Sequence, residues 1–293
     1  MNLFLQYLLN GISLGSVYAI IALGYTMVYG IAKMLNFAHG DVIMVGGYVS
    51  FCAMAYLGMP GWASVILAIV VCTVLGVIIE GLAYRPLREA GPLAVLITAI
   101  GVSYFLQNAA QLIWSATPKN FPTIINFPVP GFLAEYKVSA VSIVTVIACL
   151  VIMAGLMWFT SNTKTGKAMR ACSEDKAAAQ LMGVNVNKTI SLTFAIGSGL
   201  AAIAGVLLCS YSPVLQPTTG SMPGIKAFTA AVFGGIGSIP GAFVGGILLG
   251  IIEALAKAYI SSNMANSIVF AVLIVVLLVK PAGLLGKFVP EKV

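Results

Sequence analysis

The feature that most constrains this chain is a series of long apolar segments, each able to cross a lipid bilayer. An α-helix needs about 20 mostly apolar residues to span the hydrocarbon core of a membrane. The sequence therefore predicts an all-α, polytopic membrane protein with about six full spans. The segments that meet the requirement lie at approximately 7–30, 62–84, 92–115, 139–160, 190–212 and 265–281.

The charge content agrees with lipid as the main solvent of the chain. Only 8% of the 293 residues are charged and 60% are hydrophobic, whereas soluble domains carry about 25% charged residues. The formal charge of +7 comes from basic residues that flank apolar segments, and no basic patch with interleaved aromatics predicts nucleic-acid binding. The five cysteines are scattered without metal-ligand spacing, so neither a metal site nor a cofactor is expected.

Two further apolar stretches, near 31–58 and 224–258, are interrupted by glycine, proline and polar residues. They predict broken or re-entrant helical units; counted as complete spans, they would bring the total to about eight. Each half of the chain then follows the pattern of helix, broken unit, helix. Paired broken helices in corresponding positions are typical of a transport pathway.

Basic residues predict which connectors face the cytoplasm. The connector at 85–91, the long connector at 161–189 and the tail from Lys280 hold two, five and three of the fifteen basic residues, so ten in all. Cytoplasmic loops carry such an excess. Because the long connector and the tail lie on the same side, an even number of crossings must join them. The spans 190–212 and 265–281 supply two, so the unit at 224–258 is expected to return to the outer face. The same count holds for 31–58 if the N-terminus is cytoplasmic.

The first broken unit places the only histidine and a carboxylate in an apolar stretch, Asn36-Phe37-Ala38-His39-Gly40-Asp41. Polar side chains at membrane depth face the protein interior or a water-filled cavity. Two interpretations stay open for Asn36, His39 and Asp41. They line a translocation cavity, or they cap and lock the broken helix.

The second broken unit contains Gly234-Gly235-Ile236-Gly237-Ser238-Ile239-Pro240-Gly241. Glycine permits positive φ and close backbone approach, so this run predicts a functional break whose freed amides contact a solute. Close packing between small residues is the alternative. The run lacks the Lys-Ser/Thr ending of a nucleotide-binding loop. Glu253 and Lys257, four residues apart, predict an ion pair on one helix face.

Residues 161–189 predict a cytoplasmic coupling loop within a single membrane domain, 1–293. Ser173 is expected to cap a helix of about nine residues, with Glu174 and Asp175 in its first turn and Gly183 just after its end. A helix this short is not stable alone in water. We therefore expect a docking partner; the alternative is an amphipathic helix that rests on lipid headgroups.

Four motifs together resemble the LivH-type permease of branched-chain amino acid ABC importers, in order along nearly the whole chain. They are Leu35-Asn36-Phe37-Ala38-His39-Gly40, Gly166-x-Ala168-x-Arg170-Ala171, Asp175-x-x-Ala178-Ala179-x-Leu181-x-Gly183, and Gly234-Gly235-x-Gly237-Ser238-x-Pro240-Gly241-Ala242.

The resemblance implies a multi-pass permease for leucine, valine and isoleucine in the bacterial cytoplasmic (inner) membrane. It implies a second, LivM-type permease, two cytoplasmic ATPase subunits and an extracytoplasmic substrate-binding protein, besides the amino acid substrate and membrane lipid. Related permeases for urea and short amides leave the substrate class open. The implied ATPase-coupling residues are Gly166, Ala168, Arg170, Asp175, Ala178 and Gly183. The expected pathway residues are Asn36, His39, Asp41, Gly235, Gly237, Ser238 and Gly241.

The residues also bear on two other function classes, an ion-coupled transporter and an enzyme. An ion-coupled secondary transporter would need a titrating carboxylate in the membrane, for which Asp41, Glu80 and Glu253 are candidates. A membrane-embedded enzyme would need a catalytic constellation, and one histidine with no HExxH-type motif speaks against it. We expect a permease that is not itself an enzyme, with ATP hydrolysed in separate subunits.

Overall fold

The computed structural model describes residues 3–88, 90–129, 131, 136 and 138–286. Lys137, Lys287 and Lys292, which entered the predicted orientation, lie outside the described residues. The described chain is predominantly helical, as predicted. Its strands are β1 (Lys119–Asn120) and β2 (Val214–Leu215), which pair antiparallel and join two loops.

Among the described residues, six helices are long and apolar enough to cross a membrane, which confirms the predicted number. After α3 (Gly61–Ile79), the chain continues through a π-helical turn (Glu80–Tyr84) and a 3₁₀ turn (Arg85–Leu87). The six helices are α1 (Leu3–Ala32), α3 (Gly61–Ile79), α4 (Pro92–Trp114), α6 (Ala140–Asn162), α9 (Val186–Tyr211) and α11 (Ile239–Tyr259).

The sixth long helix is α11, which lies within the stretch expected to be broken. The segment expected at 265–281 forms α12 (Ala265–Val279), a shorter helix of 15 residues. Helix α11 is long because the break ends at Ser238 and no further break interrupts the apolar residues that follow. Pro240 lies in the first turn of α11, where a missing N–H has no helical partner to lose.

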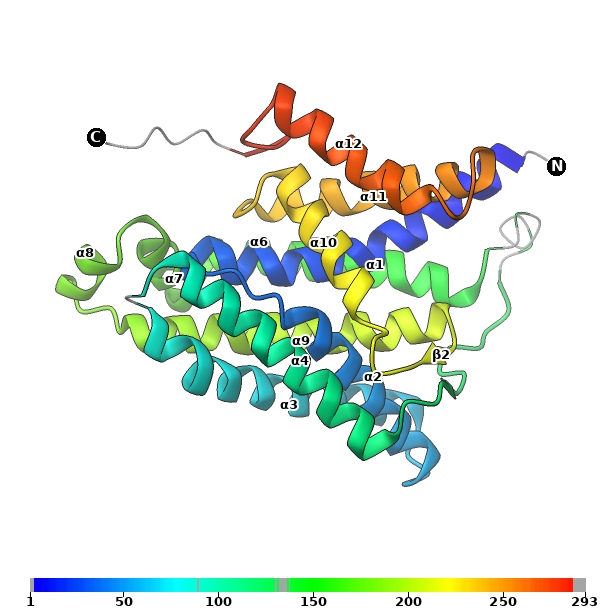
Figure 1. Cartoon of the computed structure of the whole chain (residues 1–293), viewed down its shortest axis with the longest axis horizontal. Helices are drawn as coiled ribbons and strands as arrows, with labels where there is room; N and C mark the ends of the chain where they lie inside the picture. Colours follow the sequence, from blue (N-terminus) through cyan, green and yellow to red (C-terminus); the bar gives the residue numbers. More distant parts are fainter. Residues whose placement is uncertain (1–2, 89, 130, 132–135, 137, 287–293) are drawn as a thin grey trace.

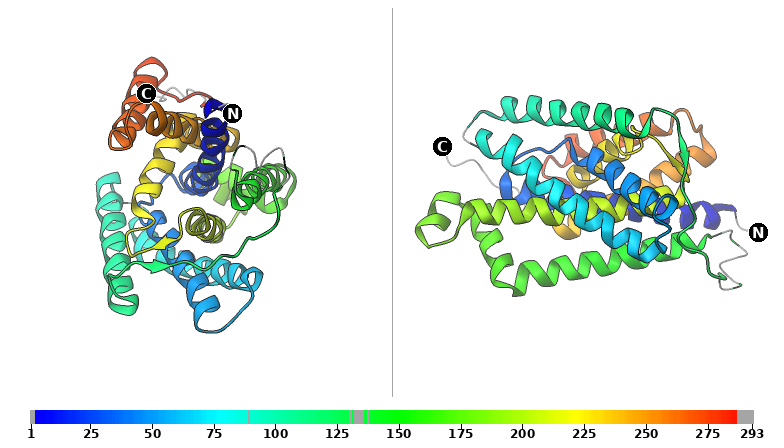
Figure 2. Two further views of the ribbon diagram at one scale, coloured as in Figure 1. Left: turned by 90° about the vertical axis from the view of Figure 1, so that its right-hand side faces the viewer. Right: turned by 90° about the horizontal axis from the view of Figure 1, so that it is seen from below.

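The two ends of the helical bundle differ. The short helices α7 (Lys164–Glu174) and α8 (Lys176–Leu181) lie at one end, called here the connector end (Figure 1). The start of α1, the β1–β2 pair and the α11–α12 turn lie at the opposite, far end, and the views in Figure 2 agree.

Helix α1 starts at the far end, whereas the expected return of the 31–58 stretch required a cytoplasmic N-terminus, on the same side as the connector. That condition is not met. Helix α1 ends at the connector end, residues 33–38 turn back into the bundle, and α2 (His39–Ala55) runs to the far end. The first interrupted stretch therefore leads across the bundle. The second behaves as expected: α10 (Ser221–Gly234) runs toward the connector end and α11 returns to the far end.

The two halves of the chain repeat one arrangement in opposite directions. Each has a long helix, a short helix that starts inside the bundle, and another long helix: α1, α2 and α3, then α9, α10 and α11. Helix α2 packs on α3 and on α9, while α10 packs on α11 and on α1. This is the inverted-repeat design found in many transporters, with broken helices at corresponding positions.

Burial separates a core from a lipid-exposed shell. Helices α1 and α9 lie in the centre and are almost wholly buried, whereas α3, α4 and α6 expose apolar faces. On α4, the side chain of Leu112 is 88% exposed and that of Phe105 is 71% exposed. Such faces suit contact with lipid, because apolar side chains are unfavourable in water and the lipid tails are apolar.

Candidate functional site

The starts of α2 and α10 meet inside the bundle. A Cβ atom on Gly220 would lie 1.8 Å from the Gly40 carbonyl oxygen, so the backbones touch and glycine is required at position 220. The first amides of a helix have no partner within it, and they carry a partial positive charge. The amides of His39, Asp41 and Ser221 donate to carbonyl oxygens just before their helices. The meeting point therefore brings two partly positive helix N-termini together in the membrane interior.

Beside this meeting point lies an open groove of about 400 Å³ between α2, α4 and α10. It has one polar side and otherwise apolar walls. The polar side chains are those of Asp41, Ser103, Gln107 and Ser221, and the walls include Phe37, Leu96, Ile100 and Ile225.

Gln107 organises the polar side of the groove. Its Nε2 atom donates to Asp41 Oδ1 at 2.9 Å and lies 3.3 Å from the hydroxyl oxygens of Ser103 and Ser221. Asp41 is 2% exposed. Among the described residues, no Lys or Arg side chain forms an ion pair with Asp41. A buried carboxylate without a cation is a favourable partner for a cationic ligand group.

Asn36 and His39 do not line this groove, although they are close to Asp41 in sequence. Asn36 Oδ1 accepts a hydrogen bond from the Tyr84 hydroxyl at 2.8 Å. The ring of His39 packs against Tyr25, with centroids 4.6 Å apart, and is 1% exposed. These contacts hold the two residues against neighbouring helices, but neither residue caps α2, whose N-cap is Ala38 without a side-chain cap. Asp41 lines the groove, and its role in a pathway stays a prediction.

The glycine-rich break lies at the connector end, apart from the groove. Gly235 and Gly237 have φ angles of 107° and 94°, which favour glycine. The Ser238 hydroxyl caps α11 by accepting from the Gly241 amide at 3.2 Å. A Cβ atom on Gly241 would lie 2.5 Å from the Gly234 carbonyl oxygen. The break is therefore a tight turn between α10 and α11.

A buried ion cluster ties α10 to α11. Glu253 Oε1 lies 2.8 Å from Lys226 Nζ and 2.6 Å from Lys257 Nζ. The Tyr18 hydroxyl of α1 donates to Glu253 Oε2 at 2.9 Å. The predicted pair of Glu253 and Lys257 is confirmed, and Lys226 joins it from a different helix.

The coupling loop forms two helices, and its expected cap is wrong. Ser173 lies within α7, and Thr163 caps that helix by accepting from the Gly166 amide at 2.9 Å. Asp175 separates the helices and caps α8 by accepting from the amides of Ala177 and Ala178 at 2.8 and 3.0 Å. A carboxylate at this position satisfies two free amides, whereas a serine reaches one. Gly183 follows α8 with φ of 84°, as predicted.

The end of α8 presents apolar side chains to the outside. Leu181 is 88% exposed and Met182 is 84% exposed. Ala168 of α7 is partly buried, and Ala178 of α8 is exposed. An apolar tip at the end of a short helix is typical of a docking point.

Cations gather where this loop meets α1. Lys176 Nζ donates to the Ala32 carbonyl oxygen at 2.7 Å, at the C-terminal end of α1, which favours positive charge. Burial, followed by the nearby Arg88 and Lys33, lowers the pKa of Lys176. Arg88 pairs with Glu80 and donates to Asn187 of α9. Lys176 thus joins the coupling loop to α1, and Arg88 joins the segment after α3 to the start of α9.

The structure brings one residue from the coupling set together with two from the pathway set. Arg170 lines a cavity at the connector end with Gly237 and Ser238. Sequence reasoning missed Ser103, Gln107 and Ser221 as groove residues, and it left Lys226 unassigned. A polar side chain inside an apolar span, such as Gln107 within 92–115, is the signal that could have found them.

Comparisons with known proteins find matches along nearly the whole chain. Residues 7–278 match the family model described as branched-chain amino acid transport system / permease component. The chain is 48% identical to the high-affinity branched-chain amino acid transport system permease protein LivH of Escherichia coli K12, over 99% of this chain and 98% of that protein. It is 46% identical to the corresponding permease protein BraD of Pseudomonas aeruginosa, with the same coverage. A probable branched-chain amino acid transport permease protein LivH of Methanocaldococcus jannaschii is 29% identical over 91% of this chain and 88% of that protein.

Proposed function

Because this chain belongs to the branched-chain amino acid transport permease family, we propose that it is the membrane subunit of an ATP-driven importer for leucine, valine and isoleucine. The observation that carries the proposal is full-length identity of 46–48% to permeases of such systems. The chain is a multi-pass membrane protein, and its host membrane is the bacterial cytoplasmic one. ATP is hydrolysed in separate subunits.

The groove between α2, α4 and α10 supports a pathway for a zwitterion with an aliphatic side chain. The Asp41 carboxylate suits the substrate ammonium group. The N-terminal end of α10, beside Ser221, carries a partial positive charge that suits its carboxylate. Phe37 and Ile100 supply apolar walls for the side chain.

A second permease of the LivM type completes this pathway. The groove is open at the surface of the chain, and a polar lining at membrane depth is unfavourable against lipid. Covering it with a second subunit removes that cost and leaves a channel between the two proteins. An extracytoplasmic binding protein delivers the amino acid at the far end.

Two ATPase subunits dock on the connector end of the permease pair, and the exposed tip of α8 at Leu181 and Met182 supports that role. Movement of this loop passes to the membrane helices, because Lys176 is bonded to the end of α1 and α7 continues directly from α6. Gly166 lies at that corner, where a Cβ atom would be 2.2 Å from the Phe159 carbonyl oxygen. Access then alternates between the two sides of the membrane.

The alternative substrates and the ion-coupled alternative receive no support. The similar permeases named above belong to branched-chain amino acid systems, not to urea or amide systems. Of the three candidate coupling carboxylates, Glu80 is paired with Arg88, and Glu253 is paired with two lysines. Asp41 has no cationic partner among the described residues, and we assign it to the substrate ammonium group.

Reconstitution tests the proposal. The chain is placed in proteoliposomes with its second permease, ATPases and binding protein, and uptake of labelled leucine is followed with and without ATP. We expect uptake that requires ATP and is competed by valine and isoleucine but not by urea. Uptake that persists without the ATPases and disappears with the proton gradient would contradict the proposal.

A further inference from the structure

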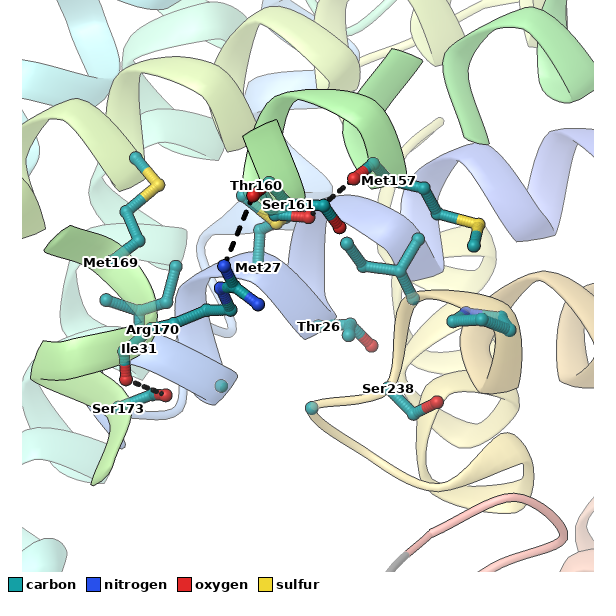
Figure 3. A pocket seen from close by; sticks show the side chains of 14 residues that line it. Thr26, Met27, Ile31, Met157, Thr160, Ser161, Met169, Arg170, Ser173 and Ser238 are labelled. Carbon is teal, nitrogen blue, oxygen red and sulfur yellow. Dashed lines mark hydrogen bonds between the residues drawn. The ribbon is translucent and has the colours of Figure 1, made fainter. Parts of the chain in front are cut away.

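A second cavity, of about 280 Å³, lies at the connector end and shares no lining residue with the groove (Figure 3). Its walls come from four segments: the last turns of α1 and of α6, the helix α7, and the break between α10 and α11. It is therefore an open cavity that the coupling loop and three membrane segments line jointly. Its volume is near the lower end for ligand pockets, which is about 300 Å³.

The lining contains one charged residue, Arg170, and no carboxylate. Arg170 Nη2 donates to the Ser161 carbonyl oxygen at 3.3 Å, which holds the guanidinium at the cavity wall. A guanidinium has five N–H donors in a planar fork that matches a carboxylate. Several of these donors remain for a bound anion.

A buried hydroxyl without a partner points to a ligand as well. Thr26 of α1 is 2% exposed, and its Oγ1 atom has no hydrogen-bond partner among the described residues. Thr160, on another wall, bonds instead to the Leu156 carbonyl oxygen four residues earlier at 2.8 Å, as helical threonines commonly do. An unsatisfied hydroxyl is costly inside a protein. Figure 3 shows Thr26 and Ser238 across the opening from Arg170.

The rest of the wall is apolar and adaptable. Met27, Met157 and Met169 line it from three different helices, together with Ile31 and Ile239. Methionine side chains are flexible and polarisable, and they accommodate aliphatic groups of different shape. The cavity thus offers a carboxylate partner, a hydroxyl and an aliphatic surface.

We infer that this cavity binds a free aliphatic amino acid from the connector side and that its occupancy slows import. Arg170 binds the carboxylate, the Thr26 hydroxyl oxygen accepts from the ammonium group, and the methionines pack on the side chain. A ligand bound here joins α7 to the α10–α11 break, and so restrains the loop on which the ATPases act. The inference rests on the proposed function for the substrate class and for the orientation of the connector.

Cysteine protection tests the binding site in the assembled transporter, in inside-out vesicles without ATP or binding protein. Ser161→Cys places a thiol in the cavity wall, and a membrane-impermeant maleimide reports its access. Native Cys172 is buried, which raises its pKa and keeps its thiol unreactive. Lys164→Cys is the matched control, because Lys164 is an exposed connector residue that does not line the cavity.

We expect leucine to slow alkylation of the Ser161→Cys thiol and to leave the Lys164→Cys thiol unchanged. Isocaproate, which lacks the amino group, protects at roughly tenfold higher concentration, and leucinamide, which lacks the carboxylate, does not protect. Adding Thr26→Val abolishes the difference between leucine and isocaproate. Protection by leucinamide equal to that by leucine, or by added phosphatidylglycerol alone, would overturn the assignment.

The regulatory part is tested by uptake into proteoliposomes loaded with leucine. For each variant, the uptake rate with internal leucine is divided by the rate without it. In the wild type we expect this ratio to be below one. It should move toward one in Thr26→Val and return to the wild-type value in Thr26→Ser. An unchanged ratio in Thr26→Val refutes the inference. If the wild type imports leucine but shows no protection, only this inference fails; if leucine is not imported at all, the proposed function fails.

Discussion

The Lys226 ammonium lies 2.8 Å from the Glu253 carboxylate, and this buried contact joins α10 to α11 beyond the turn that connects them. Lys226 is 6% exposed and Glu253 is 1% exposed. The pair is not isolated, because Lys257 and the Tyr18 hydroxyl also contact Glu253. The short helix α10, whose start forms part of the groove, is therefore held at a defined position.

Removing Glu253 should destabilise the protein more than removing Lys226. Glu253→Gln leaves Lys226 buried without an anion, which costs about 3 kcal/mol. In Lys226→Met, the carboxylate keeps Lys257 at 2.6 Å, so we expect a smaller loss of about 1 kcal/mol. Thermal unfolding of the purified complex in detergent measures both.

The double variant Lys226→Met/Glu253→Gln provides the control for this pair. It has no unpaired buried lysine at position 226, so we expect it to be more stable than Glu253→Gln alone. A loss of stability in the double variant that equals the sum of the two single losses would show that the two residues are not energetically coupled.

Gln107 is expected to control transport rather than assembly. In Gln107→Ala, the hydrogen bond that holds Asp41 Oδ1 is lost, and the carboxylate no longer has a defined position toward the substrate ammonium. We expect leucine uptake to fall about tenfold, which corresponds to about 1.4 kcal/mol in the barrier. The neighbouring Asn108→Ala is the matched control, since Asn108 is exposed and bonds only within α4. Similar uptake by both variants would argue against the groove.

Gly220 should tolerate no side chain. A methyl group in Gly220→Ala would overlap the Gly40 carbonyl oxygen, so α2 and α10 must separate, at a cost of roughly 1–3 kcal/mol. We expect lower complex yield and slower uptake. Gly101→Ala on α4 is the control, because no heavy atom lies within 4 Å of its added Cβ. A Gly220→Ala protein with normal yield and uptake would contradict the close approach.

The tip of α8 should decide whether the ATPases remain attached. Replacing Leu181 and Met182 by serine removes two exposed apolar side chains without changing the buried Ala179 beneath them. We expect at least a fivefold loss of co-purified ATPase subunits, while the second permease stays bound. The exposed Gln180→Ala in the same helix is the control. Retention of the ATPases by the double serine variant would place the docking point elsewhere.

Several features of the fold could be predicted because they depend on neighbouring residues. The length of each apolar run sets whether it can span a bilayer, and five of the six long helices were located in this way. Gly183, with a φ angle of 84°, ends α8 where local preference predicts. The cap of α8 was misassigned to Ser173 because several residues there suit that role, and helix α7 occupies the space before Asp175.

The chain alone thus determined the class of protein, the helical content and the positions of the two breaks, because membrane thickness and backbone preference act on contiguous residues. Tertiary structure decided which polar groups meet. Asp41 accepts a hydrogen bond from Gln107 of another helix while its neighbour His39 packs against Tyr25, and Lys226 pairs with Glu253 on a different helix. These choices follow from how helices far apart in sequence pack against each other. At membrane depth a polar side chain must find its partner there, since lipid provides none.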